Sequence, residues 1–391
     1  MEKRLDIGIV GCGIGGLALA ALLGQRGHQV TIFDKFDAPT AVGSGLVIQP
    51  VGLDVLRAVG AAEYALEKGQ KLTHMLGHET KSKQTVLQVS YGKRFGLAIH
   101  RASLFESLFR VAVDAGCVMR TSADVSGTEL SGDKRLVILN EKSEAFDLVV
   151  DASGAGSVLT PMPRKPLSFG ALWATVDWPE GTDLPVYQLS QCYKGAAHMV
   201  GVLPIGCLPD DNTNKAAIFW SLPQNAYADW QAQPIATWKA QAADLWPKFA
   251  PFLDQINTHD DLTMAFYHHG TLKTPHTERL AFIGDAAHCA SPQLGQGANM
   301  ALLDALALAD MLERFPLEKA LPAYAKSRRR HVWVYQWISR LFTPVYQSNS
   351  KILPWLRNWL FAPLMRVPPI PWILKTLVSG NIVAAIKRGP K

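Results

Sequence analysis

Three glycines near the start of this 391-residue chain have the spacing of a phosphate-binding turn. Gly11, Gly13 and Gly16 occupy the places of the G-x-G-x-x-G pattern, and Asp34 follows further along the chain. Such glycines permit a tight turn, close approach of the backbone to a pyrophosphate, and close packing of a helix whose N-terminus attracts phosphate. Asp34 would accept hydrogen bonds from an adenosine ribose. The pattern therefore predicts a dinucleotide site, and it is shared by NAD and FAD.

A second group of candidate residues lies near position 290. Asp285 comes directly after a buried strand in RLAFIGDAAH, where a carboxylate can bind ribityl hydroxyls or water on a pyrophosphate. In the following loop, SPQLGQGANM, the successive N–H groups from Gly295 to Gly297 can point at an anionic ring edge. Arg101 stands at the start of a predicted helix and could reach a phosphate or a flavin edge, although a solvated arginine is the alternative.

These residues are positioned by alternating strands and helices. A strand over 6–10, a helix over 17–23 and a strand over 29–34 give a βαβ opening, and the strand–loop–helix pattern returns after residue 279. The intervening region changes to tryptophans, prolines and alternating strands. The sequence predicts an α/β fold with a Rossmann-like dinucleotide-binding domain, which the resemblance given below identifies as an FAD-binding domain, interleaved with a β-sheet substrate domain, plus a C-terminal helical segment. The predicted boundaries are 1–70, 95–160 and 271–318 for the first domain, 71–94 and 161–270 for the second, and 319–391 for the segment.

Composition excludes several classes of protein. With 48% hydrophobic and 18% charged residues the chain is not disordered, and the longest apolar runs are too short for an ordinary spanning helix. Five widely spaced cysteines without a CxxC pair favour neither a disulfide framework nor zinc, so no metal site is predicted. The first residues run into the glycine turn as a strand, which favours a cytoplasmic protein without a signal peptide.

The last 73 residues differ in charge from the rest of the chain. Residues 319–391 hold 13 Lys and Arg and no Asp or Glu, whereas the preceding residues carry 26 basic and 33 acidic side chains. Five of the eleven tryptophans also lie there. Basic residues mixed with tryptophan favour an anionic membrane surface, on the inner face of the membrane, over nucleic acid. The alternative is a helical subdomain that packs on the body with its cations in water.

Taken together, GCGIGG, Asp34, the Arg101 helix, GDAAH and SPQLGQGANMALLD resemble the FAD-dependent class A aromatic hydroxylases of the p-hydroxybenzoate hydroxylase fold. The tail resembles, more loosely, hydroxylases of ubiquinone biosynthesis. The resemblance implies that Pro292 and Gly295 lie beside the reactive flavin carbon, with no acid or base assigned. It implies cofactor contacts for Gly11, Gly13, Gly16, Asp34, Lys35, Arg101, the Val125 backbone, Gly284, Asp285, Gly295, Gln296, Gly297 and Asn299.

The activity implied by this resemblance is a monooxygenase reaction. FAD would activate dioxygen as a C(4a)-hydroperoxide and hydroxylate a hydrophobic, aromatic or polyunsaturated small molecule, with NAD(P)H as electron donor. Two departures, Ser153-Gly154 and Leu159, replace residues associated with NAD(P)H and pyrophosphate contacts and leave room for a partner reductase. The alternatives are a reductase or dehydrogenase of isoprenoid-like double bonds and a non-catalytic membrane-associated flavin-binding protein. Polar candidates in the middle region, none assigned as a base, are Tyr187, Tyr193, His198, Tyr267, His268 and His269.

Overall fold

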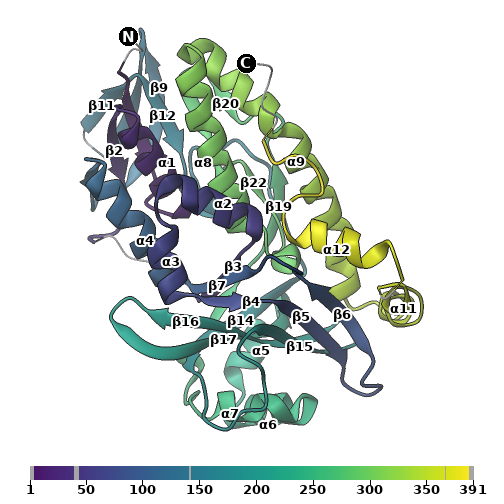
Figure 1. The fold of residues 1–391 in the computed structure, drawn as a ribbon. Coiled ribbons are helices and arrows are strands. Elements are labelled where there is room, and N and C mark those ends of the chain that lie inside the picture. The colour runs from purple at the N-terminus through teal and green to yellow at the C-terminus, as the bar shows by residue number, and fades with distance from the viewer. Residues whose placement is uncertain (1–3, 39–43, 141, 366, 387–391) are drawn as a thin grey trace.

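The fold is built on two large sheets joined by smaller ones (Figure 1). The structure is a computed structural model that describes residues 4–38, 44–140, 142–365 and 367–386. The first large sheet has five parallel strands and one antiparallel edge strand. Its order is β20 (His276–Thr277), β21 (Leu280–Phe282), β12 (Leu148–Asp151), β1 (Asp6–Val10), β2 (Gln29–Phe33) and β8 (Val118–Arg120).

Helices cover one face of this sheet. The central one, α1 (Ile14–Gln25), contacts α8 (Gly297–Arg314) and α4 (Arg101–Asp114), and every residue from Gly15 to Leu23 is buried. A helix that is apolar on all sides is stable only when it is enclosed. The small residues of GGLALAALLG allow the enclosing elements to approach closely. On the opposite face, the antiparallel strands β9 (Val125–Ser131), β10 (Lys134–Leu139) and β11 (Lys142–Phe146) form a three-stranded sheet.

The second large sheet has seven strands and lies at the bottom of Figure 1. Helices α5 (Tyr227–Ala232), α6 (Ile235–Leu245) and α7 (Ala250–Leu253) add aromatic residues to its core, where Trp220 and Trp238 pack edge to face. Its order is β18 (Thr263–Ala265), β14 (Phe169–Asp177), β17 (Asp211–Pro223), β16 (His198–Leu208), β15 (Gln188–Lys194), β5 (His74–Glu79) and β6 (Thr85–Ser90). Because β5 and β6 come from the early part of the chain, the two domains are interleaved as the sequence predicts.

Short strands connect the two large sheets. One small sheet joins β3 (Gly45–Ile48), β7 (Gly96–His100) and β4 (Gln70–Leu72), and β7 contacts β16 of the large sheet. The other joins β13 (Lys165–Pro166), β19 (His268–Thr271) and β22 (His288–Cys289). Helices α2 (Pro50–Val59) and α3 (Ala62–Lys68) follow β3; α2 packs beside β3, and α3 packs beside β7 and β16. The chain therefore passes between the domains at several points close to the glycine loops.

The C-terminal segment is helical, as predicted. Helix α9 (Leu317–Tyr346) runs along the right side of Figure 1, and α10 (Ile352–Leu356), a π-helical turn (Arg357–Phe361), α11 (Ala362–Leu364) and α12 (Ile370–Val378) follow it. The π-helical turn, α11 and α12 all contact β6, the edge strand of the seven-stranded sheet. In the described parts of the chain no helix combines the length and apolar character required to cross a bilayer.

Candidate active site

The first glycine loop joins β1 to α1. Gly11 has a φ of +105°, and a Cβ there would lie 2.7 Å from the Ala152 carbonyl oxygen. A Cβ on Gly16 would lie 2.1 Å from the Gly11 oxygen. A Cβ on Gly13, in contrast, would meet no protein atom within 4 Å, and no side chain caps the first turn of α1. Protein packing thus requires glycine at 11 and 16, whereas Gly13 faces the open space that a phosphate would need.

Asp34 follows β2 and lies beside this loop. Its Oδ2 accepts a hydrogen bond of 2.7 Å from the Cys12 N–H, and its Oδ1 accepts one of 3.1 Å from the Phe36 N–H. The carboxylate is half-buried and fixes the shape of the loop. Lys35 is exposed, with its Nζ 5.6 Å from the centre of the Phe36 ring. The binding of a ribose by Asp34 and of a cofactor by Lys35 remain predictions.

A hollow of about 510 Å³ lies at the end of β2. It is lined by residues of β2, β8 and the β10–β11 hairpin, including Phe33, Arg120 and Leu139. Val125 pairs with Leu139 in the neighbouring strand and is buried. The structure therefore brings Asp34 and Val125 to the same end of the parallel sheet, where the sequence predicts the adenosine part of the cofactor.

The second group of residues follows β21, which is parallel to β12. Gly284 has a φ of +60°, so the chain turns sharply before Asp285. The Asp285 side chain is accessible to solvent, yet protein surrounds it, and this partial desolvation raises the pKa of its carboxyl group despite the opposing charges of His288, Arg101 and Arg164. The accessible carboxylate can therefore contact a ligand.

Asp304 anchors this turn from α8. Its buried carboxylate accepts hydrogen bonds from the Gly284 N–H (2.9 Å), His288 Nε2 (2.6 Å) and Arg328 Nε (2.7 Å). Burial alone would raise the pKa of Asp304, but the charges and hydrogen bonds of His288 and Arg328 lower it to about 2. His288 therefore has the structural role of holding the turn. Arg328 belongs to α9, and the sequence analysis did not identify it.

The loop before α8 carries the residues predicted to lie beside the flavin ring. Pro292 begins a single 3₁₀ turn, and Gly295 ends it with a φ of +58°. Gly297 begins α8, and a Cβ there would meet nothing within 4 Å. Gly297 on α8 and Gly13 on α1 therefore both face open space at the N-termini of helices that contact each other.

Gln49 is a site residue that the sequence analysis missed. Its amide is fully buried; Oε1 accepts a 2.7 Å hydrogen bond from the Tyr91 hydroxyl, and Nε2 has no partner in the described structure. That unpartnered N–H₂ lies 3.3 Å from where a Cβ of Gly295 would stand. An orphaned buried donor is costly, so a ligand carbonyl oxygen is expected to accept from it. In the sequence, Gln49 is marked only by its position between the strand that ends at Ile48 and the proline that begins α2.

Asn299 holds the same loop from within α8. Its Oδ1 accepts from the Gln49 N–H (2.8 Å), and its Nδ2 donates to the carbonyl oxygens of Gly295 (2.9 Å) and Val47 (3.2 Å). These bonds occupy the side-chain amide and fix the loop against β3. Gln296 points the other way, since its Nε2 donates to the Val378 carbonyl near the C-terminus. Both residues lie at the predicted site as positioning groups, and direct contact with a cofactor remains a prediction for each.

Arg101 begins α4 between the glycine loops and the seven-stranded sheet. It is exposed, and its positive charge lowers the pKa values of both Asp285 and Tyr267. Burial raises the pKa of Tyr267 to about 12 overall, and the Tyr267 oxygen accepts a 2.8 Å hydrogen bond from Trp173 Nε1. The Arg101 N–H donates to the Ser44 carbonyl oxygen (3.1 Å), and the Ser44 hydroxyl lies 3.3 Å from that of Thr175, two residues after Trp173 on β14. Arg101 and Tyr267 therefore both lie near β14, although they come from distant parts of the chain.

The remaining polar candidates have different surroundings. His269 is buried, neither ring nitrogen has a hydrogen-bond partner in the described structure, and burial together with Arg340 lowers its pKa. Tyr193 is enclosed and stacks against the Arg357 guanidinium at 5.0 Å. Tyr187 is 51% exposed. His198 is half-buried in β16 of the seven-stranded sheet, and His268 is half-buried in β19 of the small sheet. Of this group, Tyr267, His268 and His269 lie in or beside β19, which pairs with β22 before the second glycine loop.

The departures noted in the sequence have a structural counterpart. Ser153 donates to Asp151 at 2.6 Å and closes the turn after β12, and Leu159 packs against an apolar cluster. Arg164 nevertheless places a positive charge near this turn, because its Nη2 donates a hydrogen bond to the Ser157 carbonyl oxygen. Its buried Nε has no hydrogen-bond partner in the described structure. The charge of Arg164 also lowers the pKa of Asp285.

A closing segment, defined here as residues 377–385, packs against the cofactor loops. Its carbonyl oxygens accept hydrogen bonds from Gln296 Nε2 at Val378 (2.8 Å) and from His331 Nε2 at Gly380 (2.9 Å). Arg328 Nη1 also donates to the Ala385 oxygen. Burial and the Arg328 charge lower the pKa of His331 to about 3, so a neutral ring donates through Nε2. Residues 378–385 are thus part of the wall behind the loop from Gly295 to Gly297.

Comparison with known proteins identifies the ligand of this site. Residues 4–336 match the family described as FAD binding domain. The hispidin-3-hydroxylase of Neonothopanus nambi is 26% identical over 84% of this chain and 86% of that protein. The 3-amino-4-hydroxybenzoate 2-monooxygenase of Streptomyces cremeus is 25% identical over 81% of this chain and 80% of that protein.

Solved structures show the same fold. HpxO of Klebsiella pneumoniae, in complex with FAD and uric acid, superposes with a TM-score of 0.79 at 20% identity, covering 97% of this chain and 98% of that one. A 2-methyl-3-hydroxypyridine-5-carboxylic acid oxygenase gives a TM-score of 0.79 at 19% identity, covering 95% and 96%. The reductase and the non-catalytic alternatives are not favoured by these relatives. The glycine loops and the match over residues 4–336 together establish that the chain belongs to the FAD-binding family of class A aromatic hydroxylases and is an FAD-dependent monooxygenase.

Proposed function

We propose that the enzyme hydroxylates a small aromatic substrate whose ring carries an acidic or hydroxyl substituent. The observation that carries the proposal is that Arg101 and Tyr267 both lie near β14, and that the charge of Arg101 acts on Tyr267 and on the accessible Asp285. Arg101 would hold the negative or polar substituent, and Tyr267, whose oxygen is fixed by Trp173, would orient it by a hydrogen bond. The relatives named above act on hispidin and on an aminohydroxybenzoate, which supports this substrate class.

FAD, when bound, supplies the activation of dioxygen. The residues that would hold it are the two glycine loops, Asp34 and Asp285, with Gln49 Nε2 donating to a carbonyl oxygen of the ring. Asn299 and Asp304 keep these loops in place through hydrogen bonds of 2.6–3.2 Å. Enclosure by the sheet domain would keep water from the reacting atoms, which favours oxygen transfer over loss of the oxidant.

We further propose that NAD(P)H reduces the enzyme directly, without a partner reductase. The support is Arg164, which provides a cation near Asp285 although Leu159 stands where the family has an arginine. Anaerobic mixing of the holoenzyme with NADPH or NADH alone is expected to bleach the flavin absorbance. Bleaching only after a separate reductase is added would contradict direct reduction and leave the hydroxylation proposal intact.

The substrate proposal is tested with labelled oxygen. With ¹⁸O₂, a hydroxylated aromatic acid or phenol is expected to carry one ¹⁸O atom, and the substrate to accelerate NAD(P)H oxidation. Tyr267→Phe should lower kcat/KM about tenfold or more, with FAD content unchanged, because the hydroxyl that would orient the substrate is removed together with its hydrogen bond from Trp173. The control Tyr187→Phe, at an exposed position, should leave kcat/KM unchanged. Anaerobic reduction of the substrate with no ¹⁸O incorporation would reject the proposal.

A further inference from the structure

The C-terminal helices display an unusual number of apolar side chains. All five tryptophans of this segment are 55–72% exposed: Trp333, Trp337, Trp355, Trp359 and Trp372. None of the other six tryptophans of the chain is exposed. We call these five side chains the tryptophan surface. Large exposed apolar side chains concentrated in one segment mark a part of the molecule that meets another phase or molecule.

The tryptophan surface is the outer side of helices that are otherwise packed on the body. On α9, Trp333 and Trp337 are one turn apart and follow Arg329 on the same ridge, while Tyr335 and Gln336 face inward and are buried. On α12, Leu377 is buried and Leu374 packs beneath the helix, while Trp372 is 67% exposed. The apolar outer side is therefore not the face that holds the segment to the body.

The charged residues of the segment 319–391 have one sign. Lys326, Arg329, Arg330, Arg340 and Lys351 are exposed, and residues 319–391 contain no Asp or Glu. Arg328 and Arg357, which are buried, instead bind Asp304 and backbone carbonyl oxygens. Exposed cations in a segment that contains no acidic residue complement an anionic surface. At interfaces between proteins, in contrast, charged residues are rare at the centre and occur with both signs around it.

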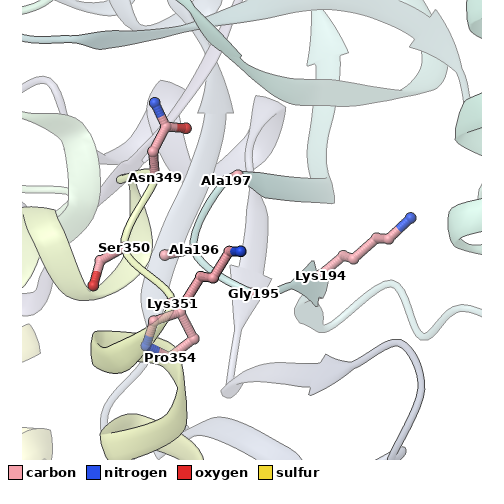
Figure 2. A pocket seen from close by; sticks show the side chains of 8 residues that line it. All are labelled: Lys194, Gly195, Ala196, Ala197, Asn349, Ser350, Lys351 and Pro354. Carbon is pink, nitrogen blue, oxygen red and sulfur yellow. The ribbon is translucent and has the colours of Figure 1, made fainter.

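A hollow of about 390 Å³ lies at the edge of this surface, between the turn after β15 and the loop that leads into α10 (Figure 2). The Lys351 side chain reaches toward the turn at Gly195, and Lys194 points away from it. Ile352 and Trp355, next along α10, are 69% and 58% exposed. Cationic and apolar groups thus occur together here, as in the headgroup layer of a membrane.

We propose that the tryptophan surface docks the enzyme on an anionic lipid bilayer, with the tryptophans in the headgroup layer and the lysines and arginines on anionic lipids. The inference goes beyond the proposed function, because it concerns where the enzyme binds and not what it catalyses. A second copy of the chain, whose body is acidic, is the competing occupant.

Vesicle sedimentation of the full-length holoenzyme tests the docking. Binding to vesicles of phosphatidylcholine with phosphatidylglycerol should exceed binding to phosphatidylcholine alone by about tenfold or more and should weaken in high salt. Tryptophan emission should shift to the blue on binding, because exposed indoles leave water. Equal binding to both kinds of vesicle, or binding to neither, would overturn the proposal.

A triple variant and a matched control separate lipid from protein. Trp355→Ala/Trp359→Ala/Trp372→Ala should lower vesicle binding about tenfold, with FAD content and unfolding temperature unchanged. The control, Val186→Ala/Tyr187→Ala, removes two exposed apolar side chains from the sheet domain and should bind vesicles as the parent does. If the triple variant binds vesicles unchanged, or if it instead loses a concentration-dependent dimer that the parent forms without lipid, the lipid assignment is wrong.

Discussion

The tryptophans of the seven-stranded sheet domain and those of the C-terminal helices lie in opposite environments. Trp220, Trp230 and Trp238 are at most 5% exposed and pack against one another edge to face. Trp355 and Trp359, in contrast, are 58% and 72% exposed. The same residue type therefore stabilises the fold in one region and is presented to the surroundings in the other.

A pair of alanine substitutions should show this contrast most strongly. Trp238→Ala is expected to lower the free energy of unfolding by about 3–5 kcal/mol, because it leaves a large cavity between Trp220 and Trp230. Trp355→Ala should change the free energy of unfolding by less than about 0.5 kcal/mol, because most of the Trp355 side chain is already exposed to water in the folded protein. Urea denaturation of the two variants measures both; comparable losses would show that Trp355 is a packed residue.

Helix α9 carries the same contrast on its two sides. Asp304→Asn would leave the Arg328 guanidinium buried opposite a neutral amide, and should cost about 3 kcal/mol of stability. Arg329 follows Arg328 on α9 but lies on the exposed side of the helix. Arg329→Gln should therefore lower the free energy of unfolding by less than about 0.5 kcal/mol. Thermal unfolding of both holoproteins compares them. An Asp304→Asn enzyme as stable as the parent would mean that the buried ion pair does not hold the Gly284 turn.

Acid should remove the stabilisation that Asp304 gives to the buried side of α9. The pKa of Asp304 is lowered from 3.8 to about 2, so its stabilisation is present above pH 4 and is lost as the pH falls toward 2. The loss attributable to Asp304 should be about 2 kcal/mol. Unfolding free energies of the parent and of Asp304→Asn, measured from pH 5 to pH 2.5, should converge over this window. Parallel curves would contradict the assigned shift.

A smaller effect is expected in the closing segment. Gly380 has a φ of +85°, and a Cβ there would lie 2.1 Å from Val51 Cγ1. Gly380→Ala should therefore lower stability by about 1 kcal/mol or more and loosen the Gln296 loop, which weakens FAD binding. Gly195→Ala, also at positive φ but with open space around it, is the matched control: it should lose stability without losing FAD affinity. If the parent and Gly380→Ala bind FAD with equal affinity, the closing segment does not contribute to FAD binding.

The sequence predicted best the parts of the site that depend on local backbone geometry. The turn at Gly11 and the fold class follow from strands and helices whose periodicity and glycines lie next to one another in the chain. Gln49 and Arg328 escaped prediction because their roles depend on partners such as Asn299 and Asp304, which are brought near by folding and leave no local pattern. The tail composition indicated its exposed tryptophans, but gave no sign that residues 377–385 pack behind the GQG loop.

The central claim is that two distant glycine loops hold one FAD. Gly13 and Gly297 are matched probes, because a Cβ at either position meets no protein atom within 4 Å. Calorimetric titration of apoprotein with FAD should give one site per chain. Gly13→Ala and Gly297→Ala should each weaken that site about tenfold, with the stability of the apoprotein kept within about 0.5 kcal/mol. Absence of FAD binding, or weakening by only one of the two substitutions, would contradict the claim.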